Sequence, residues 1–270
     1  MQHDILAQID SLPPLPQTVI QIDTFKRKED KSPAELAKIV GGDPLIFSTL
    51  LKVSNSPMFG FKKKIETSQM AVSLMGVNFT ISVALGSAIK NLVETSLEPY
   101  GANSDAFLST ASRAVMLGTR WANVLNPDLK ERLMLPTFLL ETGKFVIARI
   151  LKEKGLSEQF YEEVKDSINI CEVERKYLDS STSLITAAIF QKWGLSQELI
   201  DDIKYVDEPL NADNNSLEVS HIIHAVNLVC NIVSPFKEES IQAALEYAKQ
   251  YNLKPEEFEG IIRKMQEELD

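Results

Sequence analysis

The sequence predicts an all-α protein, and three observations support that prediction. Apolar residues recur at helical spacing (i, i+3, i+4, i+7) along most of the 270 residues. Alternating apolar and polar residues bounded by Asn-Gly or Asp-Gly turns, the pattern of strands and hairpins, do not occur. Helix start and stop signals separate the apolar stripes. A multi-helical fold is therefore expected, and the lack of a fixed-period repeat argues against a solenoid.

Two predicted helices near the N-terminus begin with clear signals. Ser32-Pro-Ala-Glu35 has the spacing of a capping box, in which the Ser oxygen and the Glu carboxylate each accept a backbone N–H of the first turn. Asp43 precedes Pro44. An Asp side chain caps a helix well, and Pro is favoured at the first helical position because no backbone donor is needed there. We therefore expect one helix to begin near Pro33 and another at Pro44.

The helix that begins at Pro44 also has a predicted buried face and a predicted end. Ile46, Leu50 and Val53 recur at i, i+4 and i+7, which places them on one side of the helix. Residues 55–57, Asn-Ser-Pro, follow this stripe. Pro disfavours helical backbone in the residue before it, and Asn and Ser prefer local side-chain hydrogen bonds. We expect Asn55 and Ser56 to end the helix and to have a structural role.

Further apolar stripes predict helices through the rest of the chain. They cover residues 81–92, 112–124, 133–140, 145–152, 184–193, 198–206, 219–233 and 241–247. Pro99 and Gly101 interrupt this pattern within residues 96–105, which form the predicted hinge. A polar connector at residues 207–216 leads to a helix that we expect Asn215 to cap.

Composition and charge restrict the class of protein. Hydrophobic residues make up 44% and charged residues 24%, which are ordinary globular values. The net charge of −10 lies entirely in residues 101–270, because residues 1–100 carry ten basic and ten acidic side chains. An acidic second half repels phosphate backbones, so nucleic acid is not an expected partner. No apolar run approaches the roughly 20 residues of a membrane-spanning helix. Without a secretory leader at the start, and with only Cys171 and Cys230 as thiols, a cytoplasmic location is expected.

The compact basic cluster in the chain is Lys62-Lys63-Lys64. A run of charge after a turn is most simply a solvated loop. The alternative is a docking patch for an acidic partner or for a ligand that carries phosphate. The sequence leaves both open.

Several segments carry a resemblance to a known family. Residues 12–16 read Leu-Pro-Pro-Leu-Pro, residues 43–56 run from Asp-Pro to Asn-Ser, and residues 71–76 run from Ala to Leu-Met-Gly. In this order the segments resemble the HD-related output domain (HDOD) family, a bacterial signalling module. The resemblance covers roughly residues 10–235 and departs from the family pattern where Met75 is inserted before Gly76. It implies a helical N-terminal subdomain (1–100) packed on a degenerate HD-like helical subdomain (101–270).

The resemblance also locates the positions where a catalytic HD protein would hold its metal. HD phosphohydrolases need His and Asp side chains that bind one or two metals, which activate water. The family register places these positions at Ala111, within residues 139–144, at Thr182 and at residues 206–207. None of these positions holds a histidine. A working HD metal site is therefore not expected.

The three histidines of the chain are His3, His221 and His224. Glu218 and His221 have the Glu-x-x-His spacing that places two ligands on one helical face. A di-metal site needs a second such motif and further carboxylates, which the sequence lacks. We expect a packed or hydrogen-bonded His221 and a surface-exposed His224, without a metal.

Other catalytic patterns are missing as well. The chain has no Gly-x-Ser-x-Gly elbow, and Gly143-Lys144 lacks the other residues of a phosphate-binding P-loop. Paired metal-binding cysteines and a dinucleotide-binding glycine cluster do not occur. Glu141 and Asp207 could form a carboxylate pair, but so could many other acids. We therefore predict no catalytic residue, no cofactor and no metal ligand.

Three functional hypotheses follow from this reading. The first is a non-catalytic bacterial signal-transduction module, standing alone without receiver, kinase or cyclase segments, that acts through protein–protein contacts. The second is a metal-dependent HD-type phosphohydrolase of nucleotides with unfamiliar ligands. The third is a nucleotide sensor without turnover that holds phosphate with Lys144 or Arg113. The first is the prediction, because the mapped histidines are absent.

Overall fold

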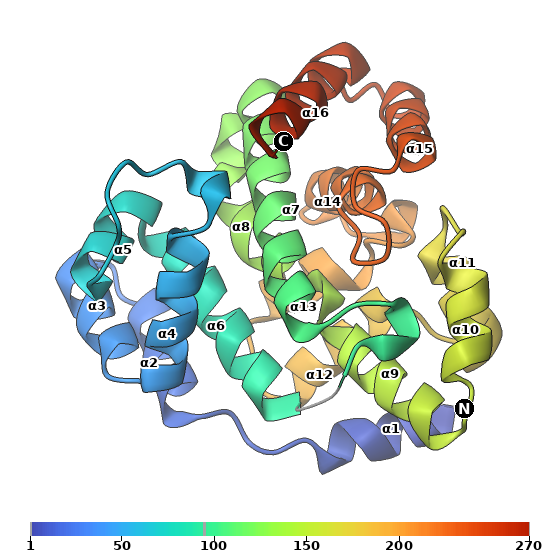
Figure 1. Ribbon diagram of the computed structural model, residues 1–270, viewed down its shortest axis with the longest axis horizontal. Coiled ribbons are helices and arrows are strands. Elements are labelled where there is room, and N and C mark those ends of the chain that lie inside the picture. The colour runs from blue at the N-terminus through green and yellow to red at the C-terminus, as the bar shows by residue number, and fades with distance from the viewer. Residues whose placement is uncertain (1, 94–95, 270) are drawn as a thin grey trace.

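Helices and short 3₁₀ turns form the computed structural model of the protein, which describes residues 2–93 and 96–269 (Figure 1). These residues contain no strand, so the all-α prediction is confirmed. The outer ends of the two predicted subdomains, Met1 and Asp270, lie outside the described residues. Within the described ranges, no helix is both long and apolar enough to cross a membrane.

The helices divide into a first group before residue 94 and a second group after residue 95. The first group is α1 (Gln2–Ser11), α2 (Gln17–Lys26), α3 (Pro33–Gly41), α4 (Pro44–Ser54), the turn η1 (Pro57–Phe59), α5 (Ser68–Met75) and α6 (Val77–Val93). The second begins with η2 (Glu98–Tyr100), α7 (Ser104–Leu125), η3 (Pro127–Leu129), α8 (Lys130–Leu139), η4 (Leu140–Thr142), α9 (Gly143–Glu153) and α10 (Ser157–Val164). It ends with α11 (Ile170–Leu178), α12 (Thr182–Lys192), α13 (Gln197–Lys204), η5 (Pro209–Asn211), α14 (Leu217–Val229), α15 (Glu238–Gln250) and α16 (Pro255–Leu269).

All eight apolar stripes fall on observed helices, from α6 to α9 and from α12 to α15. The predicted stripe of residues 219–233 extends beyond the helix on which it lies, because α14 ends at Val229. No bounds were predicted for α1, α2, α5, α10, α11 or α16. These helices are short or carry many charges, so their apolar stripes contain few residues.

Helices α2 to α5 form the left side of the view in Figure 1, and α6 joins them to the second group. Helix α6 packs on α4 and α5 and also on α8. Gly86 permits the contact with α8, because a Cβ at this position would lie 2.4 Å from a ring carbon of Phe138. One set of buried apolar side chains extends through both groups. The division into subdomains at residue 100 stays a prediction.

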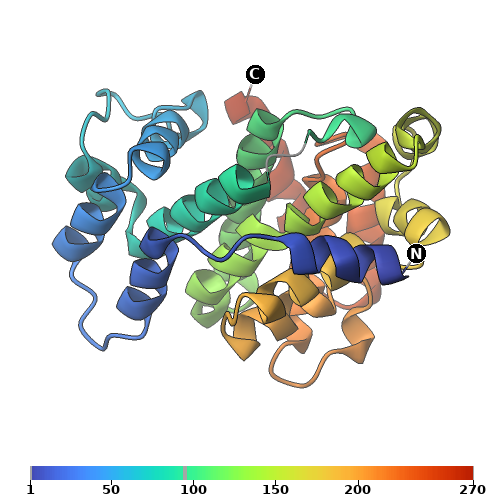
Figure 2. The same cartoon turned by 90° about the horizontal axis from the view of Figure 1, so that it is seen from below.

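Helix α1 leaves the first group and lies along α9 and α12 of the second (Figure 2). Polar contacts hold it there. Gln8 donates to Glu153 at 2.8 Å, Lys192 donates to the Asp10 carbonyl at 2.6 Å, and the Trp193 indole donates to the Pro13 carbonyl at 3.1 Å. The chain therefore begins on the second group and crosses to the first through residues 12–16.

The predicted cap of α4 is confirmed, and two other predicted caps are wrong. One Asp43 carboxylate oxygen accepts the N–H groups of Leu45 and Ile46, as expected for an N-cap. Ser32 occupies the N-cap position of α3 but makes no capping hydrogen bond, and the Glu35 carboxylate pairs with Lys28 at 2.6 Å. The cap predicted at Asn215 is also wrong, since α14 begins two residues later, at Leu217.

Asn55 does more than end α4. Its side-chain amide donates to the Leu51 and Ile65 carbonyls at 2.9 and 2.8 Å, and its oxygen accepts the Ile65 N–H at 2.8 Å. The Ile65 side chain is fully buried. Asn55 therefore closes the loop of residues 56–64 and fixes both its ends to α4.

Replacing Asn55 with Ala is expected to lower the free energy of unfolding by about 2 kcal/mol, because the Ile65 backbone loses both of its partners. Urea denaturation measures this loss. Asn214 is an exposed turn residue, and its replacement with Ala serves as the control, with a change within about 0.5 kcal/mol. Equal effects of the two substitutions would contradict this role of Asn55.

The predicted hinge is more ordered than its Pro and Gly suggest. Residues 98–100 form η2, in which Pro99 and Tyr100 are buried. The Tyr100 ring packs edge-on against Phe160, with 5.2 Å between the ring centroids. Its hydroxyl reaches across to α11, where it takes part in the buried polar cluster described next.

Candidate functional site

The positions that the HD register assigns to metal ligands lie around two neighbouring cavities. Lys144, Thr182 and Asp207 line the larger cavity, of about 220 Å³, in the second group of helices. Ala111 and Glu141 line a much smaller one. The structure thus brings these five positions together, although the sequence separates them by up to 96 residues.

Lys144 lies at the centre of this cluster. Its ammonium Nζ is 3.0 Å from Glu174 Oε1, 3.1 Å from the Thr182 hydroxyl and 3.5 Å from Glu141 Oε1. The same ammonium lies 4.9 Å from the centroid of the Tyr100 ring. Burial opposes the charge, but the two carboxylates outweigh it and hold the pKa of Lys144 above its ordinary value. Lys144 is therefore a buried, charged cation with its donors already engaged.

Glu174 of α11 gathers the other polar groups of the cluster. Its Oε1 accepts the hydroxyl protons of Tyr100 at 2.9 Å and Thr182 at 2.6 Å, as well as a proton of Lys144. Its Oε2 accepts the Thr182 N–H at 2.7 Å, which satisfies a free donor in the first turn of α12. Burial, followed by the charge of Glu174, raises the pKa of the Tyr100 hydroxyl. The cluster joins η2, α9, α11 and α12.

The Lys144–Glu174 pair could not be found from the sequence. A helical stripe reports which residues are buried, but the 30 residues between Lys144 and Glu174 give no spacing rule that links them. A lysine at the start of α9 also looks like an ordinary solvated residue. The available signal was the register of the Gly143-Lys144 segment, which placed Lys144 beside the lost metal ligands.

Glu141 is the member of the cluster whose carboxyl oxygens lack hydrogen-bond partners among the described residues. Neither oxygen accepts a hydrogen bond of good geometry from any of these residues, and the Lys144 ammonium at 3.5 Å is its ion-pair partner. Burial raises the pKa of Glu141; Lys144 opposes that shift, and the nearby Glu174 charge adds to it. Asp207 lines the other cavity, where it accepts a hydrogen bond from the Ser183 hydroxyl. Glu141 and Asp207 therefore do not form a carboxylate pair.

The raised pKa of Glu141 predicts a contribution to stability that falls as pH rises. Above its ordinary pKa of 4.5, the unfolded state releases the Glu141 proton while the folded state still holds it. Because the folded state then binds more protons, stability falls as pH increases through this range. Urea denaturation measures the free energy of unfolding from pH 4.5 to 8. This free energy is expected to fall less over that range in Glu141→Gln than in the wild type. Glu158→Gln, at an exposed site, should retain the wild-type slope, and an unchanged slope in Glu141→Gln would refute the assignment.

The residues present do not fit the metal of an HD centre. Ala111 has no donor atom, and Thr182 uses its hydroxyl in the hydrogen bonds to Glu174 and Lys144. The Lys144 ammonium is a positive charge among the mapped positions and repels a divalent cation. Across residues 2–93 and 96–269, no three His, Cys, Asp or Glu side chains are grouped as metal ligands.

The two histidines of α14 make separate contacts. His221 is buried, as expected, with its Nδ1 2.5 Å from the Tyr247 hydroxyl. The surface position expected for His224 is wrong: it is half-buried, lines the larger cavity and has its Nδ1 2.7 Å from the Val206 carbonyl. Burial lowers the pKa of both. Glu218 instead accepts a hydrogen bond from Asn126 at 3.1 Å, so Glu218 and His221 do not combine.

The error over His224 has a physical cause. Its helical face also carries Ser220, Asn227 and Asn231, a polar set typical of a solvated surface. In the structure, Ser220 and Asn231 are buried, and Asn227 lines both cavities. A polar helix face that lines an internal cavity has the same sequence pattern as one that faces water.

The two phosphate-binding candidates lie apart. Lys144 lines the larger cavity of the cluster, whereas Arg113 lines a different cavity between α4 and α7. The walls around Lys144 carry Glu172, Glu174 and Asp207 against Lys144 and Arg175, a formal sum of −1. An acidic cavity whose lysine is already paired is a poor phosphate site.

Lys62, Lys63 and Lys64 are exposed in the loop that Asn55 closes. Phe59 and Phe61 of the same loop stack on each other, with 5.7 Å between ring centroids. A docking role for the three lysines stays a prediction.

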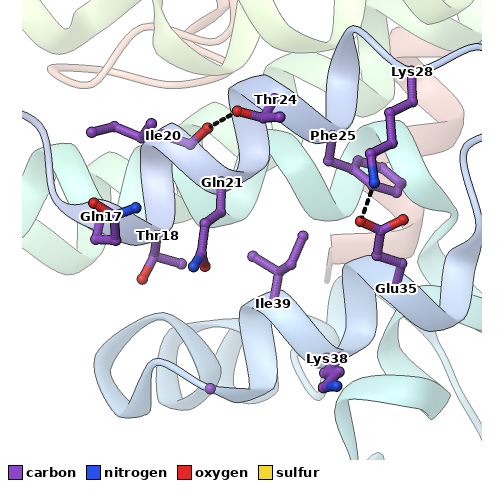
Figure 3. A pocket seen from close by; sticks show the side chains of 11 residues that line it. Gln17, Thr18, Ile20, Gln21, Thr24, Phe25, Lys28, Glu35, Lys38 and Ile39 are labelled. Carbon is purple, nitrogen blue, oxygen red and sulfur yellow. Dashed lines mark hydrogen bonds and ion pairs between the residues drawn. The ribbon is translucent and has the colours of Figure 1, made fainter.

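A larger hollow lies on the first group, between α2 and α3. Figure 3 shows this groove, of about 720 Å³, with Ile39 pointing from α3 toward α2. The ion pair of Lys28 and Glu35 joins the two helices at one end (Figure 3). Ile20, which also lines the groove, is 48% exposed. The groove therefore offers apolar side chains to an incoming molecule.

The comparisons with known proteins agree with the fold. The family model described as the HDOD domain matches residues 12–209, which confirms the resemblance found in the sequence. No curated protein matches the chain.

Solved structures share the fold at low sequence identity. An HDOD domain protein of unknown function from Geobacter sulfurreducens is 14% identical, with a TM-score of 0.74 over 99% of this chain and 93% of the other. A protein from Shewanella amazonensis, provisionally named a phosphohydrolase, is 16% identical, with a TM-score of 0.69 over 98% and 93% of the two chains. A protein from Marinobacter aquaeolei, provisionally named a signal transduction protein, is 18% identical, with a TM-score of 0.71 over 99% and 64%.

Proposed function

Because the chain belongs to the HDOD domain family, we propose that it is a non-catalytic regulatory module of bacterial signal transduction that acts through protein contacts. The observation that carries this proposal is the buried Lys144–Glu174 pair among the positions of the HD metal ligands. A paired ammonium cannot activate water or polarise a phosphoryl group as a metal does. The name of the Marinobacter neighbour supports a signalling role, and the proposed location is the cytoplasm.

The alternative of a metal-dependent phosphohydrolase is favoured by the name of the Shewanella neighbour. It predicts transition metal bound in stoichiometric amount and phosphate release from nucleotides that a chelator abolishes. The nucleotide sensor predicts binding without turnover. Isothermal titration with guanosine nucleotides and cyclic dinucleotides tests it, and the acidic walls around Lys144 weigh against it.

We place the proposed protein contact in the groove between α2 and α3. The occupant is a segment of a partner protein that packs apolar side chains on Ile20 and Ile39. Exposed Gln17, Gln21 and Thr24 offer hydrogen bonds along the same groove. Aliphatic contacts beside polar groups at the edge are typical of protein–protein interfaces.

Replacing Ile20 with Asp is expected to reduce partner capture at least about tenfold, since a charge would then have to be buried against apolar side chains. Pull-down from the native lysate with quantitative mass spectrometry gives the amount of each protein captured by the variant relative to the amount captured by the wild type. Leu210 is 70% exposed on η5 in the second group, and Leu210→Asp is the matched control. A partner of the groove is lost with Ile20→Asp and retained with Leu210→Asp. If no captured protein behaves this way, the groove is not the contact surface.

A further inference from the structure

A cavity between the two groups of helices has the features of a small-molecule site. Val53, Ser56 and Met58 from α4 and η1 line one side, and Leu108 and Arg113 of α7 line the other. The cavity measures about 450 Å³, within the usual range of roughly 300–1,000 Å³ for ligand pockets. It is separate from the cluster around Lys144 and from the groove between α2 and α3.

The walls of this cavity are largely apolar. The Leu108 side chain is 4% exposed and that of Val53 is 7% exposed, so both are fixed parts of the core. Met58 and Pro57 supply further apolar surface from the turn after α4. Methionine adapts its shape to a ligand easily because its side chain is unbranched and flexible. The cavity therefore favours a hydrocarbon body.

Arg113 is the charged group of this cavity that lacks a partner. Lys52 pairs with Asp105 at 2.7 Å, and Glu268 at the rim pairs with Arg120 at 2.8 Å. Arg113 forms no ion pair or hydrogen bond with the described residues. The charged side chains of the wall sum to zero, but Arg113 is the member that has no ion-pair partner among the described residues. A guanidinium suits a carboxylate because its planar donors match the two oxygens.

Ser56 provides a second unused donor. Its hydroxyl oxygen is buried and has no hydrogen-bond partner, although it lines the cavity. Ser56 stands at the N-cap position of η1 but accepts no backbone N–H there. A buried polar group without a partner is unfavourable, so an acceptor in the cavity would be stabilised by it.

We propose that this cavity binds a small amphipathic carboxylate, with its anionic group on Arg113 and Ser56 and its hydrocarbon chain against Val53, Met58 and Leu108. The ligand would contact both groups of helices at once. A molecule that binds only the folded junction stabilises it by mass action. This gives a regulatory module an input that is independent of the protein groove, so either proposal can fail alone.

The test is isothermal titration of the full chain with sodium decanoate. Three further probes test the hydrocarbon chain and the negative charge of decanoate separately. Acetate lacks the chain, 1-decanol lacks the charge, and decyltrimethylammonium carries a positive charge instead. We expect saturable binding of decanoate at one site per chain, with each other probe at least about tenfold weaker, which corresponds to about 1.4 kcal/mol. Equal binding of decanol, or no binding of decanoate, would overturn the proposal.

Variants locate the site. Arg113→Gln should weaken decanoate at least about tenfold, the loss expected for a charge-assisted hydrogen bond. Arg27→Gln removes the same charge from the exposed C-cap of α2 and should leave binding unchanged. Ser109 is exposed and lines the cavity, so Ser109→Phe should block it without disturbing the core. Thermal unfolding confirms that each variant is folded. Binding that survives both Arg113→Gln and Ser109→Phe would show that decanoate binds elsewhere and would reject the site.

Discussion

Replacing Lys144 with Met is expected to lower the free energy of unfolding by about 3–5 kcal/mol, the usual effect of removing one partner from a buried ion pair. The Glu174 side chain is only 1% exposed, so its charge cannot be solvated by water when the ammonium is lost. Glu141, already without a hydrogen bond, loses its counter-ion as well. Urea denaturation at pH 7 measures the change.

Two comparisons distinguish this effect from a general loss of charge. Lys176→Met removes an exposed ammonium whose partner, Glu163, is only half-buried, and it should change stability far less. The double variant Lys144→Met, Glu174→Gln removes both charges of the Lys144–Glu174 pair and should recover part of the loss. A single-variant loss below about 1 kcal/mol would contradict the account of this pair. So would a double variant that loses as much as the two single variants added together.

Replacing Gly143 with Ala is the second prediction with a large effect, an expected loss of about 2–3 kcal/mol through overpacking. Gly143 begins α9 and lies against α12. A Cβ there would lie 2.5 Å from the Thr182 carbonyl oxygen and 2.9 Å from the Thr186 hydroxyl, which accepts the Gly143 N–H. Backbone cannot move aside as a flexible side chain can, so the two helices must separate. The separation also disturbs Thr182 and with it the contacts of Lys144.

Gly260 is the matched control, because it is also helical and a Cβ there meets nothing within 4 Å. Gly260→Ala should raise stability by about 0.5–1 kcal/mol through helix propensity alone. Thermal and urea unfolding of both variants give the sign of each effect. If Gly143→Ala is as stabilising as Gly260→Ala, the close approach of α9 and α12 is not a tight constraint.

The fold was predictable where the signals are local. Ile46, Leu50 and Val53 were placed on the buried face of α4, and all three are buried. The cap at Asp43 depends on atoms two and three residues away, which sequence patterns capture well. Ser32 shows the limit of such patterns, since its hydroxyl accepts no N–H of α3 and the Glu35 carboxylate pairs with Lys28 instead of the backbone.

The candidate site was predictable in position but not in chemistry. The family register placed Glu141, Lys144 and Thr182 among the lost metal ligands, and the structure brings them together. Glu174 was missed because it reaches the cluster from α11, a helix for which no bounds were predicted. Tertiary packing alone determines which distant carboxylate pairs with a buried lysine.

Arg113 illustrates the same limit. The sequence offered Lys144 or Arg113 as the phosphate ligand of a nucleotide sensor, and the two side chains line different cavities. Only the structure shows that Lys144 is fully paired while Arg113 has no ion-pair or hydrogen-bond partner within residues 2–93 and 96–269. The positive charges of Lys144 and Arg113 did not by themselves indicate which of the two side chains is available to a ligand.

Metal content is the most direct test of the central claim, that a paired lysine has replaced the metal chemistry of the HD fold. The protein is purified from its native source under mild conditions, dialysed against Mn²⁺, Fe²⁺ or Zn²⁺, passed through a desalting column and analysed by elemental mass spectrometry. The account predicts far less than one metal ion per chain in every case. One or two ions per chain in the wild type, lost when Glu141, Glu174 or Asp207 is replaced, would contradict it.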